Sequence, residues 1–109
     1  MSEHTTTHWI AATRFVAVHP DGVRTIVRVA IAAPEPAGKG AWRCAVSLSG
    51  LYDELAPMEG CDAVQALGLA WQLAGRLLAS FEAGGGRLEF QTGERVPLSA
   101  YFELCEGPG

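Results

Sequence analysis

Arginine is the residue type whose spacing in this chain offers the clearest chemistry. Four arginines fall on segments with strand periodicity in the first half of the sequence: Arg14, Arg24, Arg28 and Arg43. A guanidinium group forms paired hydrogen bonds with a carboxylate or a phosphate. If their strands pair, all four side chains project from one sheet face, and Arg87 joins them if its strand pairs in. The sequence therefore predicts a docking face for an acidic protein partner. The alternative is a solvated face that Glu89 and other carboxylates neutralise.

The charge of the chain is unevenly distributed. Its 109 residues include 8 basic and 12 acidic side chains, which give a formal net charge of −4. Residues 1–50 hold five of the basic and three of the acidic groups, whereas residues 51–109 hold three and nine. An acidic balance argues against binding of nucleic acid through a basic surface. We therefore expect no nucleic acid among the partners.

A search for catalytic groups finds no constellation. His4 and His8 have the spacing of helical metal ligands, but the three threonines between them favour extended chain. Cys61 precedes the predicted helix, a position that suits a nucleophilic thiol, yet no histidine is placed near it as a base. The three glycines of residues 84–86 follow a helix, whereas phosphate-binding glycines precede one. We expect no catalytic residue, no metal and no cofactor, which favours a protein other than an enzyme.

The cysteines and the apolar segments predict the compartment. Cys44, Cys61 and Cys105 are odd in number, widely spaced and free of a Cys-x-x-Cys pair, as is typical of reduced thiols in a cytoplasm. The N-terminus lacks the cationic start and apolar run of a signal peptide. No stretch reaches the roughly 18 uninterrupted apolar residues of a membrane span. We expect a cytoplasmic protein with no membrane partner.

The first two strands form a predicted hairpin. Residues 8–18 and 23–32 alternate in polarity, and His19 to Gly22 has the Pro-Asp-Gly pattern of a type I turn followed by a left-handed glycine. A three-residue loop fixes the register and places Arg14 directly opposite Arg28. The arginines then share one face. The other face is expected to hold Trp9, Ala11, Phe15, Val23, Val27, Val29 and Ile31.

The remaining elements follow from proline, glycine and helical periodicity. Asp62 and Gln65 have the spacing of a capping box, and the glycines after residue 83 end the helix that it begins. This helix is apolar over most of its circumference, so it is expected to pack against more than one element. Along the rest of the chain we expect a loop over 34–40, a strand over 41–48, an irregular segment over 49–61, a helix over 63–82, a strand over 87–91 and an edge piece over 95–98.

These elements predict an α+β fold in a single domain of residues 1–109. An antiparallel sheet of four to five strands, in β-β-β-α-β order, carries one long helix packed across one face. We expect residues 1–7 and 106–109 to be flexible tails and residues 99–105 to be a helical turn or a docked tail. Since one helix shields only one sheet face, a homodimer is expected to cover the apolar surface that remains.

Three residues outline an alternative site. Trp42 falls on the inner sheet face and Trp71 on the helix, and the ring N–H of each needs a polar partner. A ligand pocket between helix and sheet, with Asp62 among its polar groups, is the alternative to a packed core.

Two segments carry a family resemblance: Gly40-Ala-Trp42-Arg-Cys44, and Gly60-Cys-Asp62-Ala-Val-Gln65-Ala-Leu-Gly-Leu-Ala70. They resemble a family of small bacterial proteins classed as a domain of unknown function, which has a Trp-x-Cys strand and a Gly-x-Asp-x-x-Gln-Ala-Leu helix start. The resemblance covers about residues 8–91. It implies a bacterial, cytoplasmic origin and no particular activity.

Several classes of function are compatible with this sequence. The leading hypothesis is a non-catalytic cytoplasmic protein-interaction module, and a sharper version is an immunity-type protein that neutralises a toxin. A small-ligand-binding protein or an enzyme with a pocket between helix and sheet is the rival class. A third class is a structural or regulatory subunit of a larger assembly.

Overall fold

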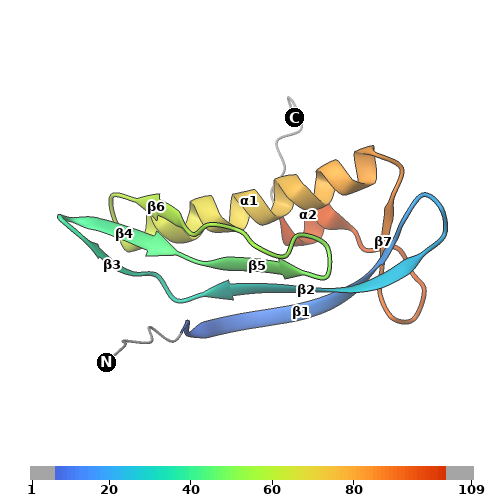
Figure 1. Cartoon of the computed structure of the whole chain (residues 1–109), viewed down its shortest axis with the longest axis horizontal. Helices are drawn as coiled ribbons and strands as arrows, with labels where there is room; N and C mark the ends of the chain where they lie inside the picture. Colours follow the sequence, from blue (N-terminus) through green and yellow to red (C-terminus); the bar gives the residue numbers. More distant parts are fainter. Residues whose placement is uncertain (1–6, 103–109) are drawn as a thin grey trace.

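The structure, a computed structural model, describes residues 7–102. Two antiparallel sheets and one long helix make up most of it (Figure 1). Sheet A has the strand order β5-β2-β1-β7, and sheet B has the order β3-β4-β6. The elements are β1 Trp9–Val18, β2 Arg24–Ala32, β3 Glu35–Gly38, β4 Ala41–Cys44, β5 Val46–Ser49, β6 Met58–Gly60, α1 Ala63–Ala83, β7 Arg87–Glu89 and α2 Leu98–Tyr101. The predicted α+β class, with one long helix on an antiparallel sheet, is confirmed.

β1 and β2 form the predicted hairpin in the predicted register. The His19 N–H donates to the Val23 carbonyl at 2.8 Å, and the Gly22 N–H donates to the His19 carbonyl at 2.8 Å. Gly22 has a φ of 93°, which glycine adopts without strain. Arg14 lies directly opposite Arg28, so the two arginines share one face of the hairpin.

The single strand predicted over residues 41–48 is two strands in different sheets. β4 pairs with β3 and β6, whereas β5 pairs with β2. The chain changes sheets at Ala45, whose carbonyl accepts a hydrogen bond from the Ala32 N–H at 3.0 Å. The buried Cys44 thiol donates to the Ala32 carbonyl at 3.2 Å. Apolar residues alternate in the same way through both strands, so periodicity contains no signal of the change.

Sheet B contains two strands in segments that were expected to be irregular. β3 lies in the proline-rich segment, where Pro36 is opposite Trp42 and Glu35 is opposite Arg43. Proline is tolerated because β3 is an edge strand, with one side free of ladder hydrogen bonds. β6 pairs with the other side of β4 and leads directly into α1.

The ends of α1 confirm the predicted caps. The Asp62 carboxylate accepts a hydrogen bond from the Gln65 N–H at 2.8 Å, and the Gln65 side-chain oxygen accepts one from the Cys61 N–H at 2.6 Å. At the other end, the Gly85 N–H donates to the Glu82 carbonyl and the Gly86 N–H to the Phe81 carbonyl, with Gly85 at a φ of 105°. This pattern of bonds is the Schellman motif.

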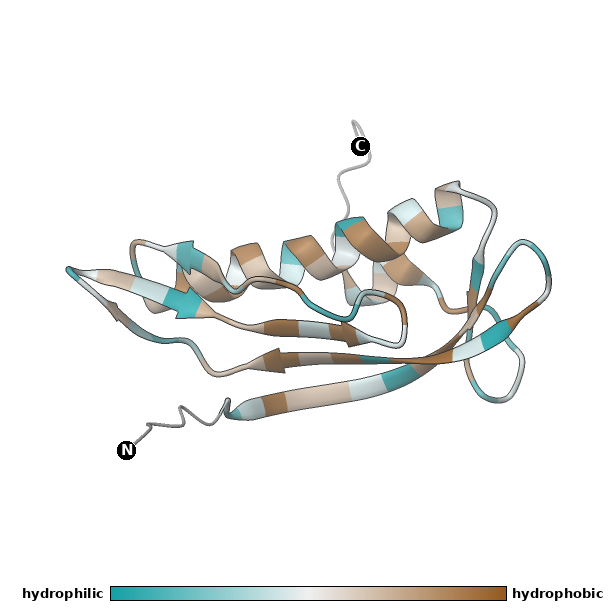
Figure 2. Ribbon diagram, in the orientation of Figure 1, coloured by the Kyte–Doolittle hydropathy of each residue, from teal (hydrophilic) through white to brown (hydrophobic). Residues whose placement is uncertain are grey.

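The hydrophobic core lies between α1 and the two sheets. Ala66, Ala70 and Ala74 have no exposed surface, which shows how closely α1 approaches the strands. Figure 2 shows brown segments in α1 and in β2 and β5, the strands along which the helix lies. The helix contacts strands of both sheets and also α2. The prediction that this apolar helix packs against more than one element is therefore confirmed.

The C-terminal part of the described chain packs onto α1. The Phe102 ring stacks on Trp71 with the centroids 4.6 Å apart and lies against Gly75. Residues 98–102 thus combine both expected conformations, a helical turn followed by a docked residue. The predicted tails, Thr7 excepted, and also His4 and Cys105 lie outside the described residues. Among residues 7–102, no helix combines the length and the apolar character that a membrane span needs.

A candidate protein-binding face

The face of sheet A opposite α1 carries a mixture of arginine and apolar side chains. We call it the outer face. Ile26 is 49% exposed on this face, and Arg14 is exposed as well. Val16 lies between Ile26 and Glu89 in the register, and Val18 lies between Arg24 and Arg87. Longer neighbours thus flank both valines, which are buried.

Arg14 and Arg28 form the centre of the outer face. They are direct cross-strand partners. Among residues 7–102, no carboxylate oxygen lies within 4.0 Å of either guanidinium group. The Arg28 guanidinium carbon lies 5.5 Å from the centre of the Trp9 ring, a cation–π contact. The pair can therefore donate hydrogen bonds to an incoming carboxylate without first breaking an ion pair in this part of the chain.

Trp9 lies on the outer face, which corrects the expectation that it faces the core. The β1–β2 register shifts between Trp9 and Ala11, so Trp9 pairs with Ala32. Ile10 is the extra residue of this bulge, and one extra residue moves every side chain beyond it to the other face. Trp9 is 37% exposed. No feature of the sequence at Ile10 marks the bulge, because β-branched residues are typical of regular strands.

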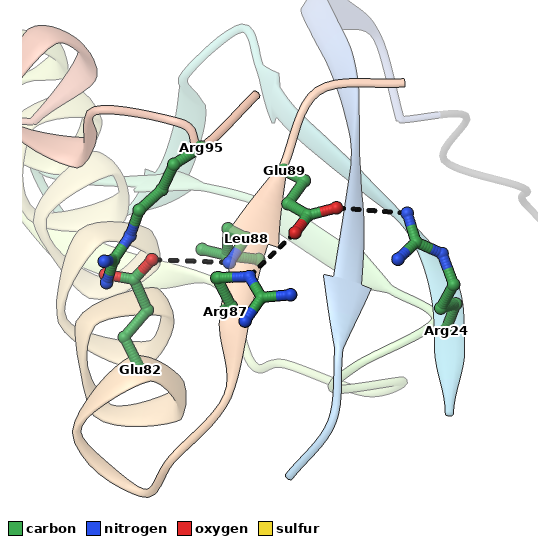
Figure 3. Close-up of polar contacts among 6 residues, drawn as sticks. All are labelled: Arg24, Glu82, Arg87, Leu88, Glu89 and Arg95. Atoms are coloured by element: carbon green, nitrogen blue, oxygen red, sulfur yellow. Dashed lines mark hydrogen bonds and ion pairs between the residues drawn. The ribbon is translucent and has the colours of Figure 1, made fainter. Parts of the chain in front are cut away.

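Arg24 is engaged in an ion-pair cluster with Glu89 and Arg87 (Figure 3). An Arg24 Nη donates to one Glu89 carboxylate oxygen at 3.1 Å, and the Arg87 Nε donates to the other at 2.7 Å. Hydrogen bonds from Arg87 and then Arg24, opposed by the burial of Glu89, hold the pKa of its carboxyl below the ordinary value. The alternative of a face neutralised by Glu89 therefore holds for Arg24 and Arg87. It does not hold for Arg14 and Arg28, which have no ion pair with Glu89.

Arg43 does not lie on the outer face. It belongs to β4 of sheet B, where Glu35 of β3 and Glu59 of β6 are its cross-strand partners. The expectation that all four arginines project from one sheet face is thus wrong for Arg43. The reason is the change of sheet at Ala45, which separates β4 from β2.

The three residues of the alternative ligand site each have a structural partner. The Trp71 ring N–H donates to the Tyr101 carbonyl at 2.9 Å, and Asp62 caps α1. Trp42 packs against the core from β4. Trp71 is nine residues along the helix from Asp62, which at 1.5 Å per residue is about 13 Å. The three side chains are thus spread along α1 and sheet B.

His19 and Cys44 also have packing or hydrogen-bond partners. The His19 ring packs edge-on against Phe81, with centroids 5.3 Å apart, and its Nε2 is 3.3 Å from the Thr25 hydroxyl. Burial raises the pKa of the Cys44 thiol, which keeps it protonated, and Cys61 is exposed. Within the described residues, no three His, Cys, Asp or Glu side chains are grouped as metal ligands.

Comparison with known proteins agrees with the resemblance seen in the sequence. A family model described as a domain of unknown function, DUF6968, matches residues 12–99. That span contains the two arginines at the centre of the outer face, both segments that carry the resemblance, and all of α1. Searches of curated proteins and of solved structures found no match. The chain therefore belongs to the DUF6968 family.

Proposed function

We propose that this protein is a non-catalytic interaction module that binds an acidic protein partner on its outer face, through Arg14 and Arg28. One observation carries the proposal: Arg14 and Arg28 are direct cross-strand partners, and among residues 7–102 no carboxylate oxygen lies within 4.0 Å of either guanidinium group. Like charges directly opposite each other weaken a sheet. A carboxylate from a partner would bridge the two groups with charge-assisted hydrogen bonds and remove the repulsion.

The surroundings of the arginine pair support a protein as the partner. Trp9 is partly exposed beside Arg28. Ile26, two residues before Arg28 in β2, is exposed on the same face. Tryptophan and arginine are the residue types most enriched among those that dominate binding energy at protein interfaces. Exposed apolar surface beside the arginines would add to the affinity for a protein partner, and the charges would orient that partner. A sheet face that only contacts water needs neither.

The roles of the reactive side chains support the non-catalytic part of the proposal. Asp62 caps a helix, His19 packs against an aromatic ring, and Cys44 donates to a backbone carbonyl. The free thiols of Cys44 and Cys61 support a reducing compartment, the cytoplasm of a bacterial cell. A homodimer stays a prediction. The like charges of Arg14 and Arg28 oppose a second copy on this face, so a dimer would form elsewhere and leave it open.

The experiment is an affinity capture from a lysate of the source cells at low and at high salt. The bait is the whole chain, and the test variant is Arg14→Glu with Arg28→Glu. The matched control is Arg43→Glu with Arg76→Glu, which makes the same change of charge away from the outer face. Circular dichroism verifies that both variants fold. We expect a protein that is captured at low salt by the wild type and the control, and lost with the test variant and at high salt.

The result that contradicts the proposal is equally concrete. Capture that the test variant retains, or a wild-type bait that captures no protein at low salt, means that the outer face is a solvated surface. A small molecule that copurifies with the wild type and is lost on substitution of Trp42 or Trp71 would move the function to the pocket class.

A further inference from the structure

Among residues 7–102, part of β1 has a free edge on the side away from β2. β7 is only three residues long and pairs with Val16, Ala17 and Val18. On that side, in the part of the chain that the structure describes, no strand pairs with residues 9–15 of β1. Figure 1 shows β7 beside only the hairpin end of β1. An unpaired strand edge presents a row of N–H and C=O groups on which another chain can pair.

The register shows which backbone groups the edge offers. The His19 N–H donates to the Val23 carbonyl, so odd-numbered residues of β1 direct their backbone groups toward β2. Even-numbered residues then direct theirs toward the opposite side. Val16 and Val18 meet β7 there, and Ala12 and Arg14 have no strand partner in the described chain. The bulge at Ile10 ends the regular part of the edge.

Two hollows lie along this edge, one on each face of β1. The first, of about 220 Å³, is on the outer face and is lined by Ala12, Thr13, Arg14 and Arg28. The second, of about 120 Å³, is on the side of α1 and is lined by Ala11, Ala12, Thr13, Val29 and Trp71. Successive side chains of a strand point to opposite faces. A strand added here would thus place one side chain in each hollow.

The two hollows differ in chemistry. Two of the four residues that line the outer hollow, Arg14 and Arg28, are cationic, which suits a carboxylate. The ring of Trp71 and the side chain of Val29 line the other, which suits an apolar side chain. The Trp71 ring is already fixed by its hydrogen bond to Tyr101 and its stacking on Phe102, so a ligand need not order it.

We propose that a segment of the partner with alternating acidic and apolar residues adds as a strand to the free edge of β1 at Ala12–Arg14. Its carboxylates contact Arg14 and Arg28, and its apolar side chains contact Trp71 and Val29. This inference rests on the proposed function and specifies how the partner binds. Strand addition derives affinity from main-chain hydrogen bonds and specificity from pockets for alternate side chains.

The positive charge of Arg14 and Arg28 favours an acidic segment over a second copy of β1 at this edge. A second copy of β1 would bring Arg14 and Arg28 of both copies onto one continuous sheet face, and like charges side by side oppose that pairing. A further hollow, lined in part by Trp9, Ser47, Asp53 and Glu54, lies toward β5. Its two carboxylates repel an acidic segment and so favour the β1 side of the outer face.

The test is an NMR titration of the whole chain with synthetic peptides. The probe is a nine-residue peptide in which Glu and Val alternate, and the charge control has Lys in place of Glu. Two further peptides carry N-methyl groups, one on the Glu nitrogens and the other on the Val nitrogens. Because successive N–H groups of a strand point to opposite edges, strand addition requires that one methylated peptide binds at least ~10-fold more weakly while the other still binds.

Variants of the protein give the second arm. Ala12→Pro removes an N–H that faces away from β2, so it leaves the β1–β2 ladder intact and blocks strand addition. Ala12→Ser retains the N–H and is the matched control. We expect the Glu–Val peptide to shift the amide signals of residues 11–14, to bind Ala12→Ser normally and to bind Ala12→Pro at least ~10-fold more weakly. If Ala12→Pro fails to fold, the methylated peptides still decide, because they use the wild-type protein.

The outcomes separate this inference from the proposed function. Equal binding of both methylated peptides, with loss of binding in Arg14→Glu, overturns strand addition and leaves the outer face as the binding surface. No preference for the Glu–Val over the Lys–Val peptide, together with salt-sensitive capture that needs Arg14 and Arg28, does the same. Protection of the Ala12 and Arg14 amides without peptide, at twice the mass of one chain by light scattering, assigns the edge to a second copy and overturns the inference.

Discussion

Arg14 of β1 and Arg28 of β2 are direct cross-strand partners on the outer face of sheet A, and the described chain places no carboxylate within 4.0 Å of either group. The neighbouring pair of arginines, Arg24 and Arg87, differs in this respect because Glu89 lies between them. One sheet face therefore contains a compensated and an uncompensated pair of guanidinium groups. If the outer face binds an acidic partner, as we propose, neutralising the Arg14–Arg28 pair would stabilise the sheet and weaken that binding.

Replacement of Arg14 by Gln should stabilise the fold and weaken binding. We expect the free energy of unfolding to rise by about 0.2–1 kcal/mol at low salt, because the repulsion across β1 and β2 is removed. At 1 M salt the Debye length falls to about 3 Å, so the gain should shrink. Urea denaturation at two salt concentrations measures this, with Arg76→Gln on α1 as the control. A lower stability of Arg14→Gln at low salt would show that the arginine stabilises the sheet.

Two glycines within α1 should respond in opposite ways to alanine. A Cβ at Gly68 meets no atom within 4 Å, so Gly68→Ala should raise the free energy of unfolding by about 0.5–1 kcal/mol through helix propensity. A Cβ at Gly75 would come within 2.8 Å of the Phe102 ring, so Gly75→Ala should lower stability by about 1–3 kcal/mol through overpacking. Thermal unfolding of the two variants checks both signs. Equal stabilisation by both substitutions would mean that Phe102 moves away without cost.

Local sequence signals predict a large part of this fold correctly. The Pro-Asp-Gly turn determines the register of β1 and β2, and the Asp62–Gln65 spacing and the glycines after residue 83 determine the bounds of α1. Each of these depends on contacts within a few residues. Local chemistry alone suffices to predict such contacts.

The sequence-based predictions are wrong where the structure depends on pairing between residues that are distant in the sequence. The strand after Gly40 changes sheet at Ala45 although its polarity alternates without interruption, and Arg43 leaves the outer face as a result. The bulge at Ile10 brings Trp9 to the outer face, and no residue there is typical of bulges. Within the described chain, β1 has a free edge because β7 is only three residues long. The length of β7 is set by its pairing with β1, which is distant in the sequence. Of the candidate site, the pairing of Arg14 with Arg28 was predictable from the sequence. Which arginines form ion pairs with a carboxylate was not.

Substitution of Asp62 tests whether this residue is a cap or a ligand group. As the N-cap of α1 it accepts a hydrogen bond from Gln65, so Asp62→Ala should lower the free energy of unfolding by about 0.5–2 kcal/mol. Asp62→Asn retains the capping oxygen and should cost much less. Urea denaturation of the two variants distinguishes them, and the capture experiment should be unaffected by either. Loss of a bound molecule with Asp62→Asn, at unchanged stability, would assign Asp62 to a ligand site.

The ion-pair cluster at Glu89 should make stability depend on pH. Because Arg87 and Arg24 lower the pKa of Glu89 in the folded state, the carboxylate stabilises the fold above its unfolded value of about 4.5. That contribution is lost as the pH falls through the lowered pKa of the folded state. We therefore expect Glu89→Gln to have a lower urea midpoint than the wild type at pH 7, and the two midpoints to converge as the pH is lowered below 4.5.

A double-mutant cycle identifies the source of this pH dependence. In a background of Arg24→Gln with Arg87→Gln, the Glu89 carboxylate has lost both of its ion-pair partners. The effect of burial on its pKa then stands unopposed by these pairs, so Glu89→Gln should no longer lower the urea midpoint at pH 7 and should raise it instead. If Glu89→Gln still lowers the urea midpoint at pH 7 in that background, the pairing of Glu89 with Arg24 and Arg87 is not the source of the acid sensitivity. Arg14 and Arg28 remain unchanged in this cycle, so the capture of an acidic partner should persist throughout.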